Sequence, residues 1–315
     1  MSQPFRLKKT IRDLKVSVDK IIQSYPKRWT VGVAVKNLET NSGIEIKGDE
    51  VFPSASTFKV AVLYELFREA DEKKVNLRRR IAIKEKYLSP GSGIINFLDS
   101  GLKLSLRDLA VFMIVLSDNT ATDIVMDTVG KENVDRLLRN LGLVKTSFPK
   151  NTKELLGDAF GIDVMAVQGR KLLELCRKKG ERGEYNPKTI VFSETRDNDI
   201  TTPKEMGQLL ENLSKGFMLT EESKEEAMKI LLEQQLNTRI PLLLPPNVEV
   251  AHKTGTLMGN INGKMTGIVN DAGIICMGND KKVILSAFTK DVDDRSKATL
   301  LIAKIAKAVH DYFAN

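Results

Sequence analysis

Residues that build metal sites and disulfide frameworks are scarce in this sequence. Its 315 residues include only 2 cysteines and 2 histidines. Cys176 and Cys276 lie in unrelated apolar stretches, which is typical of inert core thiols. The sequence therefore favours neither a disulfide framework nor a cysteine-based metal site, and neither cysteine is a good candidate for a nucleophile.

Long apolar segments are absent too. No stretch is long enough to span a bilayer, and residues 1–25 mix charged and apolar side chains without the continuous apolar core of a secretory leader. As written, the chain is expected to have no signal peptide and to be a soluble, cytoplasmic protein. A secreted or periplasmic protein whose leader had been removed would have the same sequence, so the compartment stays open.

Aromatic residues make up only 6% of the chain, and the excess positive charge, a formal net charge of +8, is spread along it. Short basic clusters occur at residues 78–80 and 177–179, without interleaved aromatic residues. We interpret them as solvated faces and expect no nucleic-acid partner. Hydrophobic residues make up 42%, enough for the core of one large domain or two closely associated ones. The sequence indicates no oligomeric state.

The two ends of the chain predict strands and terminal helices. Apolar residues at helical spacing predict an opening helix over residues 5–22. Turn-forming residues at 39–43 separate the segments 30–35 and 43–47, which predicts a hairpin. Further strands are expected at 248–252, 267–277 and 283–289, and a closing helix at 296–313.

Helical periodicity dominates the middle of the chain. Helices are expected at residues 56–73, 105–116, 120–129, 131–141, 163–179, 203–214 and 221–233. We therefore predict an α+β fold of the α/β sandwich type, with one antiparallel sheet built from both termini, flanking terminal helices and an all-helical subdomain. The α/β subdomain would comprise residues 1–53 and 234–315. The all-helical subdomain would comprise residues 54–233, with an enlarged loop region near 143–202.

A Ser-x-x-Lys motif opens the first central helix. The chain contains this pattern at least five times, but only the copy at Ser56 and Lys59 begins a strongly apolar helix. At positions i and i+3 the two side chains share one helix face, so a desolvated lysine of lowered pKa could take the serine proton. The alternative is a serine that caps the helix beside a lysine that extends to water.

A second motif, Ser117-Asp118-Asn119, ends the apolar run at 109–116. Ser117 could relay a proton between Lys59 and a leaving group, and the Asn119 amide could hold a substrate amide. Alternatively, these residues simply stop one helix and cap the next.

A third motif, Lys253-Thr254-Gly255-Thr256, follows a predicted strand. A glycine in a strand allows close approach of another backbone, and a lysine beside two hydroxyls would suit a carboxylate. The Thr256 N–H could form half of an oxyanion hole. Taken alone, this segment could equally be the turn of an edge strand.

In this order the three motifs resemble the penicillin-recognising serine hydrolases, most closely the class A β-lactamases. The resemblance covers most of the chain and includes flanking stretches: PGSGI at 90–94, SDNTA at 117–121, TTP at 201–203, HKTGT at 252–256 and NDAG at 270–273. It implies a β-lactamase/transpeptidase-like fold and opening of a β-lactam, or a related amide or ester, through an acyl-enzyme intermediate. It implies no metal or organic cofactor.

The resemblance also implies a catalytic role for the first two motifs. Ser56 would be the acyl-accepting nucleophile, Lys59 its base or the partner that tunes it, and Ser117 the proton shuttle to the leaving nitrogen. Asn119 would orient the substrate.

The third motif would bind the substrate. The resemblance implies that Lys253, Thr254 and Thr256 hold a substrate carboxylate, and that the N–H groups of Ser56 and Thr256 form the oxyanion hole. The expected partner is therefore a small molecule or a peptide that carries a carboxylate.

The base that should activate the deacylating water is harder to identify. Class A β-lactamases share an E-x-x-x-N loop, and this pattern occurs here at Glu194 and Asn198. It lies only a few residues before Thr201, closer than in that family. The alternative is that Glu194, Arg196, Asp197 and Asp199 form a surface charge cluster.

Three functional hypotheses follow from these motifs. The favoured one is a serine acyl-hydrolase of the β-lactamase type. The second is a DD-peptidase or esterase of the same fold. β-Lactams would acylate such an enzyme, and the resulting acyl-enzyme would be hydrolysed only slowly. The third is a non-catalytic sensor module, which would not need a complete proton-transfer set.

Overall fold

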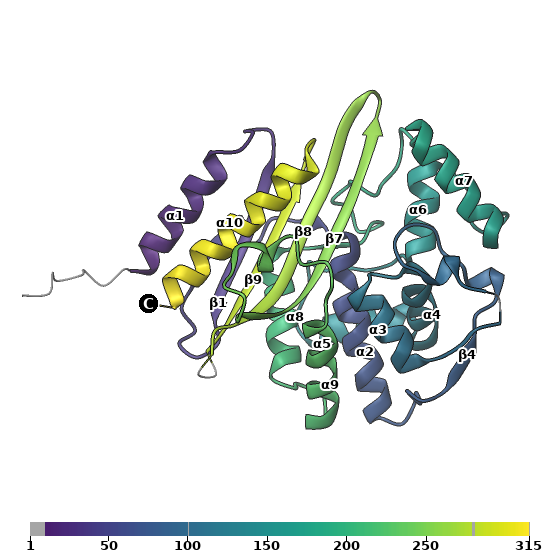
Figure 1. Ribbon diagram of the computed structural model, residues 1–315, viewed down its shortest axis with the longest axis horizontal. Coiled ribbons are helices and arrows are strands. Elements are labelled where there is room, and N and C mark those ends of the chain that lie inside the picture. The colour runs from purple at the N-terminus through teal and green to yellow at the C-terminus, as the bar shows by residue number, and fades with distance from the viewer. Residues whose placement is uncertain (1–9, 100, 279–280, 315) are drawn as a thin grey trace, which may run out of the picture.

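The computed structural model describes residues 10–99, 101–278 and 281–314. At its centre lies a five-stranded antiparallel sheet of order β2-β1-β9-β8-β7 (Figure 1). Because β1 pairs with β9, the two ends of the chain build one sheet. Its strands are Thr30–Asn37 (β1), Gly43–Ile46 (β2), Glu249–Ile261 (β7), Lys264–Cys276 (β8) and Lys282–Lys290 (β9). The predicted α+β fold is confirmed.

Helices cover both faces of this sheet. On β9, Val283 and Leu285 belong to the core that includes α1 (Ile11–Gln23) and α10 (Arg295–Phe313), whereas the alternate residue Ile284 belongs to the core of the central helices. This alternation follows from the two-residue period of a strand. Figure 1 shows α1 and α10 together at one side of the sheet.

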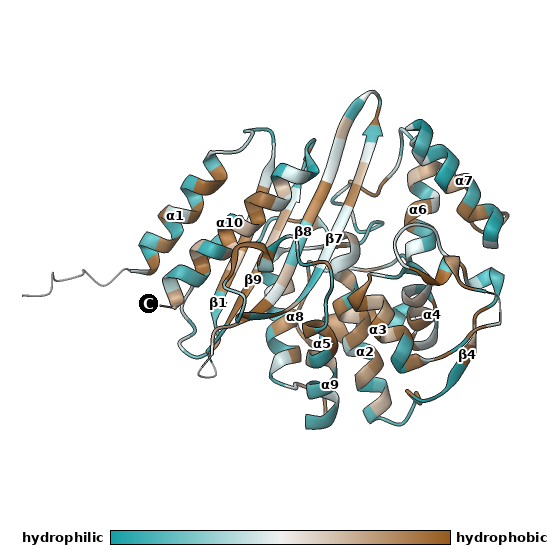
Figure 2. Ribbon diagram, in the orientation of Figure 1, coloured by the Kyte–Doolittle hydropathy of each residue, from teal (hydrophilic) through white to brown (hydrophobic). Residues whose placement is uncertain are grey.

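The central helices form the larger of the two cores. They are Lys59–Asp71 (α2), Leu106–Val115 (α3), Asn119–Val129 (α4), Lys131–Asn140 (α5), Thr152–Phe160 (α6), Gly169–Arg182 (α7), Pro203–Ser214 (α8) and Glu221–Leu232 (α9). Figure 2 shows hydrophobic residues concentrated on α2 and α3, whereas α7 is mostly hydrophilic. Helix α2 is therefore buried within this core, and α7 lies at the surface.

Short elements connect the helices to the sheet. Two small sheets pair Phe52–Pro53 (β3) with Ile200–Thr201 (β6), and Arg80–Ala82 (β4) with Lys103–Ser105 (β5). The 3₁₀ turns are Ala55–Phe58 (η1), Glu85–Tyr87 (η2), Ile95–Phe97 (η3) and Ile240–Leu243 (η4). The pairing of β3 with β6 brings the chain before Ser56 beside the chain that follows Asn198.

Several predicted boundaries need correction. The helix expected from residue 56 begins with η1, and its α-helical part starts at Lys59. The helix expected at 163–179 begins later, at Gly169, and ends at Arg182. The strand expected at 248–252 continues to Ile261 because its partner β8 is equally long.

One helix was missed altogether. The sequence analysis left residues 152–160 in the enlarged loop region, but they form α6. Asn151 starts this helix with a capping box, in which its side chain accepts from the Glu154 N–H while the Glu154 carboxylate accepts from the Asn151 N–H. The apolar stretch was too short for a periodicity argument, but the cap itself was readable.

Two expectations concern the ends of the chain and the membrane. Residues 5–9 of the predicted opening helix lie outside the described residues, and α1 accounts for the rest. Within the described ranges, none of the helices combines the length and apolar character needed to cross a bilayer.

Candidate active site

Ser56 lies in η1, between β3 and the buried helix α2. The residue before it, Ala55, has a φ of 43°, in the left-handed region that is strained for a side chain. Strand β7 passes so close to this turn that a Cβ on Gly255 would lie 2.8 Å from the Ser54 carbonyl oxygen and 3.1 Å from the Ser56 nitrogen. The glycine of the third motif is therefore required by the approach of β7 to the nucleophile turn.

Lys59 is fully buried at the start of α2. Its Nζ donates to the Ser117 carbonyl at 2.8 Å, to Ser117 Oγ at 3.1 Å and to Asn119 Oδ1 at 2.7 Å. Burial lowers the Lys59 pKa to about 7, although Asp123 and Asp118 act in the opposite direction. Within the described residues Lys59 makes no hydrogen bond to Ser56, so the serine–lysine contact expected from i, i+3 spacing is replaced by contacts to the second motif.

The second motif both caps a helix and contacts Lys59. Asp118 caps α4, as its Oδ1 accepts from the Ala121 N–H at 2.9 Å. Its neighbours Ser117 and Asn119 face Lys59 instead. Ser117 has a φ of 54°, another left-handed residue, and this turn brings both its oxygens to the ammonium.

The PGSGI stretch holds the second motif from the other side. Asp118 Oδ2 accepts from the N–H groups of Ile94 and Ile95 at 2.8 and 2.9 Å. Asn119 Nδ2 donates to the Pro90 carbonyl at 2.7 Å. With Oδ1 on Lys59 and Nδ2 on this loop, the Asn119 amide has a fixed orientation.

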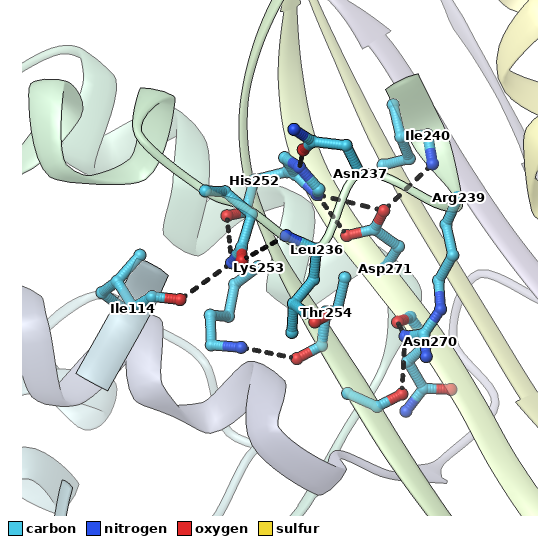
Figure 3. A network of polar contacts seen from close by, with 12 residues as sticks. Ile114, Leu236, Asn237, Arg239, Ile240, His252, Lys253, Thr254, Asn270 and Asp271 are labelled. Carbon is cyan, nitrogen blue, oxygen red and sulfur yellow. Dashed lines mark hydrogen bonds and ion pairs between the residues drawn. The ribbon is translucent and has the colours of Figure 1, made fainter. Parts of the chain in front are cut away.

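Lys253, on β7, is the second buried lysine of the site. Its Nζ donates to the Thr254 carbonyl at 2.9 Å (Figure 3). Burial lowers its pKa well below the ordinary value, and the positive charge of Lys59 lowers it further. The charged form of both buried lysines is thus disfavoured, and an anionic ligand in the site would favour it.

A buried arginine was missed by the sequence analysis. Arg239, just before η4, donates through Nη1 to the Gly255 carbonyl at 2.9 Å, and its Nη2 contacts Thr256 Oγ1. Burial lowers its pKa to about 10. No motif marked it, because a single arginine in the segment QLNTRIPLL carries no spacing signal.

A histidine–carboxylate pair lies close to Lys253 and Arg239 (Figure 3). His252 Nδ1 is 2.9 Å from Asp271 Oδ1, and its Nε2 is 3.0 Å from Asn237 Oδ1. Asp271 Oδ2 also accepts from the Ile240 N–H at 3.1 Å. Burial would raise the Asp271 pKa, but His252 and Arg239 outweigh it and hold the pKa below its usual range. The pair joins the edge strand β7 to β8 and, through the Ile240 N–H, to η4.

These elements surround a cavity of about 460 Å³. Of the seven residues predicted for the site, five line it: Ser56, Ser117, Asn119, Thr254 and Thr256. The other two, Lys59 and Lys253, are fully buried and reach the cavity through their neighbours. The structure therefore brings all three motifs together.

Glu194 lies outside the cavity. It is exposed and pairs with Lys290, with 2.6 Å between Oε1 and Nζ. This fits the surface-charge interpretation and not a role next to Ser56.

Asp199 does not belong to the surface cluster in which the alternative interpretation placed it. It is 1% exposed and lines the cavity. Its Oδ1 accepts from the Lys150 N–H at 3.0 Å, whereas Oδ2 has no hydrogen-bond partner among the described residues. Burial raises its pKa well above the ordinary value. Its burial could not be predicted from the sequence, because it follows the charged run SETRDN and only the β3–β6 pairing turns it inward.

The described residues contain no group of three or more His, Cys, Asp and Glu side chains arranged to hold a metal ion. The polar residues that line the cavity carry hydroxyls, amides, the Asp199 carboxylate and the Arg295 guanidinium.

Comparison with known proteins was made on the whole chain. A family model described as "Beta-lactamase enzyme family" matches residues 12–313. The beta-lactamase VEB-1 of Pseudomonas aeruginosa is 24% identical over 310 residues, which cover 96% of this chain and 91% of that protein.

Solved structures show the same fold. A beta-lactamase from Chitinophaga pinensis superposes with a TM-score of 0.77 at 24% identity, covering 96% of this chain and 100% of that one. The TLA-1 extended-spectrum beta-lactamase also gives 0.77 at 24% identity, covering 98% and 100%. The predicted resemblance to a β-lactamase-like serine enzyme is confirmed, and the chain belongs to the beta-lactamase enzyme family.

Proposed function

We propose that this protein hydrolyses β-lactams through an acyl-Ser56 intermediate. The observation that carries the proposal is Lys59, a fully buried amine whose pKa is lowered to about 7 and which is hydrogen-bonded to Ser117 beside the nucleophile's cavity. Membership of the family and similarity to proteins named beta-lactamase support it. They do not favour the peptidase, esterase or sensor alternatives.

In the acylation step the Ser56 hydroxyl attacks the lactam carbonyl and its proton passes to the Lys59 amine. The new bond joins Ser56 Oγ to the carbonyl carbon. The backbone N–H groups of Ser56 and Thr256 stabilise the negative oxygen that develops. When the lactam C–N bond breaks, the proton moves from Lys59 through Ser117 Oγ, 3.1 Å away, to the leaving nitrogen.

The substrate is a small molecule or peptide with a carboxylate. Thr254 and Thr256 line the cavity, and the buried side chains of Lys253 and Arg239 contact the Thr254 carbonyl and Thr256 Oγ1, respectively. Hydrogen bonds to an ionised group are about twice as strong as neutral ones, so a carboxylate gains most at this strip. Asn119, fixed by two contacts, orients the amide of the substrate.

Hydrolysis of the acyl-enzyme needs a base for water. Asp199 is the carboxylate that lines the cavity among the described residues, and its Oδ2 is free to accept a proton. A buried carboxylate of raised pKa is a stronger base than an exposed one once it is ionised. We assign it the activation of the deacylating water.

One experiment tests the proposed function. The protein is mixed with a penicillin while product release and the intact protein mass are followed together. Turnover that disappears in Ser56→Ala is the expected result. A long-lived adduct without turnover would favour the peptidase or esterase alternative, and neither adduct nor turnover with penicillin or an aryl ester would remove Ser56 as the nucleophile.

A further inference from the structure

Asn270 is the first residue of the NDAG stretch and lies on β8, where it is fully buried. Its Nδ2 donates to the carbonyl oxygens of Pro53 and Ser54, at 2.9 and 3.2 Å. These two residues lead into the turn that carries Ser56. Figure 3 shows Asn270 beside Arg239, whose Nη1 contacts the Asn270 carbonyl. The side-chain amide of Asn270 therefore joins the central sheet to the chain just before the nucleophile.

We propose that Asn270 is a positioning residue, which fixes the nucleophile turn so that the Ser56 N–H points into the oxyanion hole. The inference rests on the proposed function, because it names a further residue on which acylation of Ser56 depends. Asn270 is not among the described residues that line the nucleophile's cavity. It therefore acts through the turn and not by touching the substrate.

The nucleophile turn needs support because its backbone is strained. Ala55, between Ser54 and Ser56, has a φ of 43°, and a side-chain-bearing residue stays in this region only where the surrounding structure fixes it. The Ser54 N–H donates to the Asp199 carbonyl at 2.8 Å, and the Ser54 carbonyl accepts from Asn270. The contact with Asn270 is the one that ties this peptide to the five-stranded sheet.

Strand β9 sets the orientation of the Asn270 amide. Its Oδ1 accepts from the Thr289 N–H at 2.9 Å, which leaves Nδ2 as the end that faces the turn. The paired register of β8 and β9 ends at Asp271 and Ala287. Beyond that point side chains connect the two strands, since Thr289 Oγ1 also accepts from the Val269 N–H at 3.0 Å. Regular pairing thus stops where the amide of Asn270 reaches the turn.

The position of the Ser56 N–H decides how well it stabilises the oxyanion, because such a donor acts only when it is directed at the oxygen that becomes negative. Loss of the Asn270 donor would leave two buried carbonyl groups without this partner. Their peptides would rotate, and the Ser56 N–H would turn away from the oxyanion. The expected consequence is slower acylation at nearly unchanged substrate affinity.

The first test compares Asn270→Ala with Asn37→Ala, its matched control. Asn37 is 3% exposed and also holds a turn, as its Oδ1 accepts from the N–H groups of Glu39 and Thr40, each at 2.9 Å. Quenched-flow mass measurements give the rate of acyl-enzyme formation at saturating penicillin and the half-saturating concentration. Asn270→Ala should lower that rate about tenfold or more and change the half-saturating concentration less than about twofold. Asn37→Ala should keep both within about twofold. Thermal unfolding of both variants measures the loss of stability that they share.

The second test is Asn270→Asp, which keeps the shape of the side chain and can still accept from the Thr289 N–H. As a carboxylate it repels the two carbonyl oxygens of the turn, whereas as an acid its O–H donates to one of them. Of the neighbouring charged groups, Arg239 favours the carboxylate and Asp271 the acid. The acylation rate relative to the unmodified protein, in which the titration of Lys59 cancels, should be near one at about pH 5. It should fall about tenfold or more by about pH 9.

Two outcomes would overturn the positioning role. One is an acylation rate of Asn270→Ala equal to that of Asn37→Ala, and the other is a relative rate of Asn270→Asp that stays constant from about pH 5 to 9. If Asn270→Ala does not fold, the pH dependence of Asn270→Asp decides alone.

Failure of the proposed function is recognised separately, because the unmodified protein would then form no acyl-enzyme with penicillin. In that case crystal structures of Asn270→Asp at about pH 5 and 9 test the turn directly. Departure of Ala55 from the left-handed region at the higher pH alone would support the inference. A turn that is unchanged at both pH values would overturn it.

Discussion

Lys59 is the residue whose surroundings matter most to the chemistry. Its amine is buried at the first turn of α2, and its three hydrogen bonds all run to the second motif. Burial disfavours an ammonium here and lowers the Lys59 pKa, while Asp123 and Asp118 act in the opposite direction. The amine is held in place by Ser117 and Asn119, which lie 58 and 60 positions further along the chain.

The pH dependence of acylation tests this view. Lys59 accepts the serine proton only as a neutral amine, and its pKa is lowered to about 7. The rate of acyl-enzyme formation should therefore rise with pH through about 7 and then level off. Single-turnover kinetics with a slowly hydrolysed penicillin would show this. A rate independent of pH from about 5 to 9 would contradict the role of Lys59 as the base.

Asp199 is the residue that we propose as the base for deacylation. Asp199→Asn keeps the shape of the side chain but cannot accept a proton, so the acyl-enzyme should form and then persist, with turnover reduced by roughly a hundredfold or more. Intact-mass measurements after mixing would detect the adduct.

Glu194→Gln is the matched control for Asp199→Asn. Glu194 lies in the same loop but is exposed and paired with Lys290, so its variant should turn over normally. Normal turnover in Asp199→Asn, or an adduct that accumulates in Glu194→Gln, would contradict the assignment.

At the scale of elements, the site depends on how closely β7 passes the nucleophile turn. Gly255→Ala would place a methyl group 2.8 Å from the Ser54 carbonyl oxygen, where the backbone must shift. We expect the oxyanion hole between Ser56 and Thr256 to widen and kcat to fall roughly a hundredfold, as when one oxyanion donor is lost. Steady-state kinetics, with thermal unfolding alongside, would measure the effect.

The control for that change is Gly207→Ala, on α8. A Cβ at Gly207 would meet its nearest neighbours at 3.5 Å, an ordinary contact. This variant should keep both activity and stability. If Gly255→Ala is as active as Gly207→Ala, the close approach of β7 has no catalytic consequence.

Elements also show where sequence reasoning succeeds and where it stops. The long periodic segments, such as α3, α5 and α9, lie close to their predicted bounds, since an amphipathic pattern reports a buried face directly. The three motifs also predicted residues of the cavity wall, because each motif is a short run of neighbouring residues that can be recognised without knowing its distant contacts. The inward turn of Asp199 depends on contacts with a distant segment, which no spacing encodes.

The sequence left the deacylating base open between Glu194 and a surface charge cluster. Glu194 matches a five-residue pattern but faces solvent, whereas Asp199, the base proposed above, matches no pattern. The difference comes from β6, a two-residue strand that pairs with β3 and redirects the chain. The division into an α/β and an all-helical subdomain also stays a prediction.

At the scale of the whole molecule, the segment from Lys253 to Thr256 belongs to the sheet that both ends of the chain build. The fully buried His252–Asp271 pair joins β7 to β8 and, through the Ile240 N–H, to η4. Breaking a buried pair by removing one partner leaves an uncompensated charge or donor and costs about 3–5 kcal/mol. The pair thus stabilises the fold next to the segment from Lys253 to Thr256.

Asp271→Ala should therefore lower the free energy of unfolding by about 3–5 kcal/mol at neutral pH, measured by urea denaturation. Because the Asp271 pKa is lowered in the folded state, its contribution is present above the pKa of the unfolded chain and is lost as pH falls through the folded value. The difference between the unmodified protein and Asp271→Ala should then shrink on acidification. Glu194→Ala, which breaks the partly exposed pair with Lys290, should cost no more than about 1 kcal/mol and serves as the control. An Asp271→Ala variant as stable as Glu194→Ala would show that the sheet does not need the buried His252–Asp271 contact.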